Sequence, residues 1–314
     1  MHTGPLVVIV GPTAVGKSAL AIELCERFDG DIVSADSRQV YRGLDIGTAK
    51  PTPQERARVP HYLLDLTTPD EQLSLAEYQE LAYKAIAQIH SRARIPFLVG
   101  GTGQYVRAVV EGWSIPRVPP QPDLRGRMNQ EARARGHEVL HARLAEVDPA
   151  AAARIDPRNV RRVIRALEVY EVTGQPISKL QKKRPPPYRI LQLGLTMERQ
   201  ALYERADQRI EHMLQRGLVA EVQALFDQGY GPWLGAISGI GYGEVGRYVS
   251  GEIDLQEAVR LIKANTRRFI RHQYNWFRLD DPRIHWIEQG AGATTQAAAI
   301  IEEWLGEGQG EDAN

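Results

Sequence analysis

The chain has one cysteine among its 314 residues, Cys25, so it can form neither an internal disulfide nor a cysteine-built zinc cluster. No apolar run approaches the roughly 20 residues that a membrane-spanning helix needs. The first residues show no basic segment, apolar stretch or cleavage site of the kind that marks a signal peptide. From these absences we expect a cytoplasmic protein that does not contact a membrane.

Net charge is also absent, because 39 Lys and Arg residues balance 39 Asp and Glu residues. The charges are, however, unevenly distributed along the chain. Residues 154–189 hold ten basic and three acidic residues, residues 263–278 hold five basic residues and no acid, and residues 280–314 hold eight acids and one base. The first two segments are typical of surfaces that bind a polyanion, although ordinary solvated helices would show the same charges.

Short apolar runs alternate with helical patterns in the first third of the chain. We expect strands at 6–10, 31–36, 61–65 and 96–100, helices at 17–28 and 73–92, and a further strand at 189–196. This alternation predicts an α/β fold, with a P-loop-like parallel sheet flanked by helices.

Proline-rich stretches at 115–122 and 184–188 enclose helical patterns at 124–147 and 159–173. We therefore expect a helical insertion domain over 116–188. The catalytic core would consist of 1–115 and 189–314, and its C-terminal part is mostly helical, with helices at 199–228 and 255–279.

The clearest motif is a Walker A sequence that follows the first predicted strand and precedes a helix. Its glycines let backbone N–H groups converge on phosphate oxygens, to which the helix N-terminus adds its dipole. Lys17 would bridge phosphates and the Ser18 hydroxyl would bind Mg²⁺. The motif predicts phosphate binding through Gly11, Pro12, Thr13, Ala14, Val15, Gly16, Lys17 and Ser18.

Polar residues follow three other predicted strands. Asp36 ends the second strand, and ligands of open α/β sheets bind at such ends, so Asp36 is a candidate general base or metal ligand. A simple turn aspartate is the alternative. Asp65, after the third strand, competes for the role of metal ligand. The glycine-rich turn 100–103 follows the fourth strand, where Thr102 could hydrogen-bond a leaving oxygen or merely belong to a tight turn.

Basic residues supply the remaining candidates. Arg216 precedes a glycine inside a helical pattern and could stabilise charge on a departing phosphate, although for this residue taken alone a solvent-facing arginine is the better interpretation. The segment 265–278 interleaves arginines with aromatic residues. Lys263, Arg267, Arg271 and Arg278 fall on one helical face, which would suit RNA phosphates, and residues 158–165 offer a similar face on the insertion.

Together these pieces resemble the bacterial tRNA dimethylallyltransferases, also called tRNA isopentenyltransferases. The matching stretches are 11–18, 36–41, 43–51, 100–103, 161–170, 216–218, 239–242 and 265–278. The sequence Gly-Leu-Asp-Ile-Gly-Thr-Ala-Lys-Pro at 43–51 has no generic P-loop explanation, so it makes the match specific. The family's Lys-Glu after Gly-Tyr is Gly243-Glu244 here, which removes one lysine as a phosphate contact.

The resemblance implies transfer of a dimethylallyl group from its diphosphate to N6 of adenosine 37 in the tRNA anticodon loop. Asp36 would be the base, Mg²⁺ the cofactor, and Thr102 and Arg216 would stabilise the leaving diphosphate. The protein would act as a monomer. The tRNA anticodon stem-loop would contact Asp36, Ser37, Arg38, Gln39, Thr102, Arg125, Arg161, Arg162, Arg165, Arg267, Arg271 and Gln273.

Three other functions compete with this hypothesis. A P-loop kinase of a small metabolite and an adenylate isopentenyltransferase would both leave the basic insertion unexplained. A non-catalytic P-loop module that binds RNA would leave Asp36 and Arg216 without a role.

Overall fold

The computed structural model describes residues 4–231 and 237–311. Contacts divide the chain into two compact units, a core unit of Met1–Val110 with Pro187–Asn314 and an insertion unit of Glu111–Pro186. No helix in the described part of the chain is long and apolar enough to cross a membrane.

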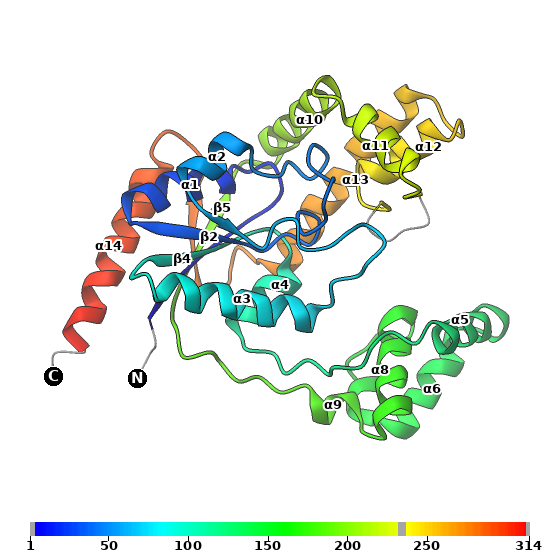
Figure 1. The fold of residues 1–314 in the computed structure, drawn as a ribbon. Helices are drawn as coiled ribbons and strands as arrows, with labels where there is room; N and C mark the ends of the chain where they lie inside the picture. The colour runs from blue at the N-terminus through cyan, green and yellow to red at the C-terminus, as the bar shows by residue number, and fades with distance from the viewer. Residues whose placement is uncertain (1–3, 232–236, 312–314) are drawn as a thin grey trace. The chain divides into compact units, whose positions relative to one another are not determined.

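The core unit is built on a six-stranded sheet in which every neighbouring pair is parallel, in the order β3-β2-β4-β1-β5-β6 (Figure 1). The strands are β1 (Pro5–Val10), β2 (Gly30–Ser34), β3 (His61–Tyr62), β4 (Ile95–Val99), β5 (Arg189–Thr196) and β6 (Ile284–Glu288). Because all strands run the same way, their carboxyl ends meet along one edge of the sheet. The predicted α/β class with a parallel sheet is confirmed.

Alternation along β1 explains why both faces of the sheet are covered. Leu6, Val8 and Val10 join a core cluster with the helices α3 (Leu75–His90) and α4 (Gly103–Val110). Val7 and Ile9 join a second cluster with α1 (Lys17–Arg27) and α14 (Ala293–Glu311) on the opposite face (Figure 1). Burying each such aliphatic side chain contributes about 1.5–3 kcal/mol, which fixes the sheet between two helical layers.

The remaining core helices are α2 (Pro53–Arg58), α10 (Arg199–Gln215), α11 (Leu218–Asp227), α12 (Tyr242–Val249) and α13 (Leu255–Trp276). The single helix predicted over 199–228 is in fact two. Gly217 separates them with φ of +97°, a left-handed conformation that no continuous helix accommodates. Strand β6 and helix α14 were not predicted.

The insertion unit is helical and has its own apolar core. It contains α5 (Pro122–Arg135), α6 (His137–Val147), α7 (Pro149–Ala152), α8 (Val160–Thr173) and α9 (Ile177–Leu180). Gly136, with φ of +90°, divides the helical pattern 124–147 into α5 and α6. Leu140, Leu144, Val163 and Leu167 are among the buried residues that join these helices.

Gly100, directly after β4, tests how tightly the carboxyl edge of the sheet is packed. A Cβ at this position would lie 2.1 Å from the backbone oxygen of Ala35. Because backbone cannot yield as a side chain does, we expect Gly100→Ala to lower the free energy of unfolding by about 1–3 kcal/mol. Urea denaturation measures the change.

The matched control is Gly306→Ala in helix α14, where an added Cβ would meet nothing within 4 Å. Alanine there should leave stability unchanged or raise it by up to about 1 kcal/mol, because glycine is a poor helix former. Equal stability of the two variants would contradict the close approach at Gly100.

Candidate active site

The phosphate loop connects β1 to α1 in the conformation that its glycines permit. Gly11 has φ of +144°, and a Cβ on it would lie 2.3 Å from the carbonyl oxygen of Leu195 in β5. Gly16, with φ of +108°, immediately precedes the first turn of α1. The N–H groups at this helix start therefore face the loop, as an anion site requires.

Lys17 lies at the centre of a group of charges. Its Nζ donates a hydrogen bond to the carbonyl oxygen of Pro12 at 2.7 Å. The pKa of Lys17 is lowered to about 7, chiefly by burial and also by repulsion from Arg209, whereas the Asp36 carboxylate acts in the opposite direction. These three charges therefore lie close enough to influence one another.

Asp36 is positioned by the turn that follows β2. Its Oδ1 accepts a hydrogen bond from the backbone N–H of Arg38 at 2.8 Å. The next residue, Ser37, donates its backbone N–H to Oγ1 of Thr102 at 3.0 Å, and the Thr102 N–H donates to the carbonyl of Ala35 at 3.2 Å. The structure thus joins the turns after β2 and β4, beside the phosphate loop after β1.

Arg216 is not part of this group. It caps the C-terminal end of α10, where its backbone N–H donates to the carbonyl of His212 at 2.9 Å, and its exposed side chain has no hydrogen bond or ion pair with another described residue. Arg209, two turns earlier in the same helix, interacts with both Lys17 and Asp36. Burial lowers the pKa of Arg209, and Asp36 opposes that shift. The sequence did not single out Arg209, because no unusual residue lies beside it, whereas Arg216 stands next to a glycine within a helical pattern.

Gln273 differs most from its predicted role as an RNA contact. The side chain is only 3% exposed, so its amide is not at the surface. Its Oε1 accepts from the backbone N–H of Thr13 at 2.8 Å and its Nε2 donates to the carbonyl of Gly101 at 3.0 Å. Gln273 of α13 therefore joins the phosphate loop to the glycine turn after β4.

Asp65 forms ion pairs beyond β3, which β2 and β4 separate from the strand that carries the phosphate loop. Its Oδ1 lies 2.5 Å from Nζ of Lys50, and its Oδ2 lies 3.1 Å from a guanidinium nitrogen of Arg56. Among the described residues no group of three or more His, Cys, Asp or Glu side chains could hold a metal ion. Ser18 is exposed in the first turn of α1, so its hydroxyl can reach an ion beside a bound phosphate.

Two of the four predicted RNA-binding arginines of the insertion unit are engaged internally. Arg125 forms two hydrogen bonds with Glu168, at 2.7 and 2.8 Å, and Arg165 forms one at 2.6 Å. Glu168 is fully buried, and although burial raises its pKa, these hydrogen bonds keep the pKa below its ordinary value. Arg161 and Arg162, in contrast, are exposed on α8.

The two arginines of α13 that were predicted to bind RNA lie on the surface beside Tyr203 of α10. Arg267 forms an ion pair with Asp207 at 2.6 Å and lies 5.6 Å from the centre of the Tyr203 ring. Arg271 donates to the Tyr203 hydroxyl at 3.4 Å. Both side chains remain exposed, whereas Arg38, Ser37 and Gln39 near Asp36 are partly exposed.

The pKa of Lys17 can be tested directly by NMR of its ε-methylene group. Removing the attractive carboxylate with Asp36→Asn should lower the pKa of Lys17 below its value of about 7. Removing the repulsive cation with Arg209→Gln should raise it. Arg216→Gln is the control and should leave it unchanged; a shift in this variant equal to that of Arg209→Gln would contradict the arrangement.

Comparison with known proteins shows the family to which the chain belongs. The family model described as "IPP transferase" matches residues 39–280. A tRNA dimethylallyltransferase of Roseiflexus sp. (strain RS-1) is 53% identical over 96% of this chain and 99% of its own length, and one of Dehalococcoides mccartyi is 49% identical over 97% and 94%.

Solved structures of such transferases are also similar to this chain. The full-length tRNA isopentenylpyrophosphate transferase of Bacillus halodurans has a TM-score of 0.73 and 39% identity, with 99% of both chains covered. A eukaryotic dimethylallyltransferase acting on tRNA has a TM-score of 0.81 and 26% identity, over 97% of this chain and 80% of that one. This chain belongs to the IPP transferase family, the family of the tRNA dimethylallyltransferases.

Proposed function

We propose that this enzyme transfers the dimethylallyl group of dimethylallyl diphosphate to N6 of adenosine 37 in the anticodon loop of tRNA, releasing diphosphate. Membership of the family supports the reaction type. The observation that carries the proposal is the placement of the Asp36 carboxylate within electrostatic reach of Lys17 on the phosphate loop. One group can therefore accept a proton beside the place where the other binds an anion.

The phosphate loop serves a leaving group in this proposal. The diphosphate binds to the backbone N–H groups around Gly16 and to Lys17, whose lowered pKa means that it takes up a proton as the anion arrives. The exocyclic amine of adenine is a poor nucleophile because its lone pair is delocalised into the ring. As N6 forms its bond to the allylic carbon, the bond from that carbon to the diphosphate oxygen breaks, and Asp36 accepts the N6 proton.

Charge on the departing diphosphate needs fixed donors. We assign this role to Arg209, which interacts with Lys17 and Asp36, in place of the predicted Arg216. Thr102 remains a candidate donor to the leaving oxygen, because its hydroxyl lies at the turn next to Ser37. The Ser18 hydroxyl would hold Mg²⁺ together with diphosphate oxygens and water, and the ion would neutralise charge on the leaving group.

The exposed arginines are the proposed tRNA contacts. Arg161 and Arg162 on the insertion unit and Arg267 and Arg271 on α13 offer charge to phosphates, while Ser37 and Arg38 would meet the extruded adenine. Arg125, Arg165 and Gln273 would support the protein's own structure instead, because their polar atoms bind other parts of the chain. A monomeric state and a cytoplasmic location remain predictions.

The decisive experiment incubates the protein with radiolabelled dimethylallyl diphosphate, Mg²⁺ and unmodified tRNA. We expect label in the anticodon loop at adenosine 37. Label in free AMP but not in tRNA would indicate an adenylate isopentenyltransferase, and phosphate transfer from ATP to a metabolite would indicate a kinase. Either of these results would overturn the proposal.

The assignment of the base predicts a separation of catalysis from binding. Asp36→Ala should reduce turnover by about 10²–10⁴-fold, the usual contribution of a general base, with little loss of tRNA affinity. Single-turnover rates and filter binding measure the two quantities. Equal losses in both would contradict the role of Asp36 as the base.

The assignment of the leaving-group donor predicts a difference between two arginines of α10. Arg209→Gln should reduce single-turnover transfer by about 10²–10³-fold, as loss of a preorganised donor does. Arg216→Gln, seven residues along the same helix, is the matched control and should stay within about twofold of wild type, since an exposed side chain usually matters little. A larger loss of transfer in Arg216→Gln than in Arg209→Gln would contradict this assignment and favour Arg216, the residue predicted from the sequence.

The proposed tRNA surface predicts a change in salt dependence. Replacing both Arg161 and Arg162 with alanine should weaken tRNA binding and reduce the slope of log K against log salt by about 1–2, because up to two phosphate contacts are lost. Arg27→Ala with Arg58→Ala is the control, since these exposed arginines pair with Glu302 and Glu26. An unchanged slope in the first variant would remove α8 from the interface.

A further inference from the structure

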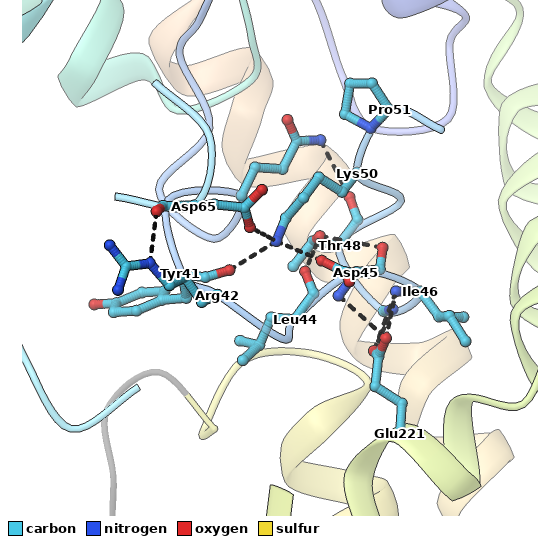
Figure 2. A network of polar contacts seen from close by, with 12 residues as sticks. Tyr41, Arg42, Leu44, Asp45, Ile46, Thr48, Lys50, Pro51, Asp65 and Glu221 are labelled. Carbon is cyan, nitrogen blue, oxygen red and sulfur yellow. Dashed lines mark hydrogen bonds and ion pairs between the residues drawn. The ribbon is translucent and has the colours of Figure 1, made fainter. Parts of the chain in front are cut away.

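The segment 43–51 contributes no group to the proposed chemistry, yet it contains a buried lysine. Figure 2 shows Lys50 at the centre of a polar network, with its ammonium directed at a backbone carbonyl and two carboxylates. The side chain of Lys50 is 1% exposed. A cation so far from water is stable only when all of its donors have partners.

All three N–H donors of Lys50 do have partners. Its Nζ lies 2.7 Å from the carbonyl oxygen of Tyr41, 2.5 Å from Oδ1 of Asp45 and 2.5 Å from Oδ1 of Asp65. The second oxygen of Asp65 pairs with Arg56, so two cations balance two carboxylates. The consequence for the chain is that the backbone at Tyr41 is fixed to a charged centre.

Glu221, in the first turn of α11, holds the same segment from its other side (Figure 2). Its carboxylate accepts hydrogen bonds from the successive backbone N–H groups of Asp45, Ile46 and Gly47, at 3.1, 2.8 and 3.2 Å. The Tyr242 hydroxyl donates to Oε1 of Glu221 at 2.6 Å. Helix α11 follows α10, which carries Arg209, after the turn at Gly217.

The segment in turn holds the residues next to the proposed base. Nε2 of Gln39 donates to the carbonyls of Thr48 and Ala49, both at 3.3 Å, and its Oε1 accepts from the Ser34 hydroxyl at 3.1 Å. Together with the bond from Lys50 to Tyr41, these contacts fix the chain on both sides of Asp36. The path runs from α11 through 45–50 to the turn after β2.

We propose that Lys50 and Glu221 are positioning residues for the transfer reaction, which hold the turn carrying Asp36 in register with the phosphate loop and with the helix carrying Arg209. This inference rests on the proposed function. Neither side chain touches the reacting atoms. They act by keeping the base where it meets N6, and a misplacement of about 1 Å can cost 10²-fold in rate.

The first test replaces Lys50 with methionine, which keeps the length of the side chain and removes its charge. We expect kcat for transfer to fall by about 10–100-fold, because the base is displaced while the phosphate loop is not. For the same reason KM for dimethylallyl diphosphate and the affinity for inorganic diphosphate should change less than about threefold. The matched control is Lys84→Met, an exposed lysine paired with Glu80, which should keep wild-type kcat.

The second variant, Glu221→Gln, keeps the shape of the side chain and leaves the buried lysine intact, so it serves if Lys50→Met does not fold. It should also lower kcat selectively, while Glu252→Gln, an exposed glutamate paired with Arg247, should not. A folded variant with wild-type kcat would overturn the proposal. So would a loss of kcat that equals the loss of diphosphate-binding sites, since this would indicate unfolding alone.

Amide hydrogen exchange tests the positioning without any reaction. In both variants the N–H groups of Arg38 and Tyr41 should exchange about tenfold faster or more, as local opening becomes easier, while Val7 in β1 keeps its protection. Unchanged exchange in 36–41 would contradict the inference. If the wild-type protein transferred no dimethylallyl group, the proposed function would fail, and exchange would still decide whether this network holds the turn.

Discussion

The attraction of the Asp36 carboxylate for two cations, Lys17 and Arg209, is the interaction around which the rest of the site is arranged. The two cations repel each other, and burial further disfavours their charges. Only a carboxylate or an added anion relieves this repulsion. A site with this balance binds an anion readily and surrounds it with positive charge. In the proposed reaction this positive charge would stabilise the diphosphate as it leaves.

The parallel sheet makes this arrangement possible. The three segments that carry Lys17, Asp36 and Thr102 follow β1, β2 and β4, which run the same way. Their turns therefore meet at one edge, although up to 85 residues of sequence separate Lys17 from Thr102. Gln273 and the network around Lys50 then fix the distances between turns that the sheet alone would leave adjustable.

Local signals were sufficient for the elements that depend on local chemistry. The apolar run before Gly11 and the Walker A spacing predicted β1, the loop and α1, because backbone sterics and hydrogen bonding within a few residues determine them. Asp36 was proposed as a site residue because it ends a predicted strand; in the structure β2 ends at Ser34, and Asp36 lies in the turn that follows. Strand β6 was missed because Ile284–Glu288 is short and half polar, and becomes a strand only by pairing with β5.

Long-range partners explain the other differences. Nothing near Arg209 in the sequence reveals that its helix directs it to Lys17, and nothing near Gln273 reveals the loop that it braces. Counting charges also overestimated the basic surface of the insertion, because Arg125 and Arg165 form ion pairs with the buried Glu168. Charge composition describes the amount of arginine in a segment, whereas only packing decides how much of it faces solvent.

The two hydrogen bonds of Gln273 have a consequence for what this position tolerates. One end of the side chain must accept a hydrogen bond from the Thr13 N–H, and the other must donate a hydrogen bond to the Gly101 carbonyl. A carboxylate can do only the first, and a glutamate here would have to retain its proton to do both. An aliphatic residue would do neither. The requirement is for a polar group of mixed character rather than for charge or bulk, which makes the neutral amide the side chain best suited to join the two turns.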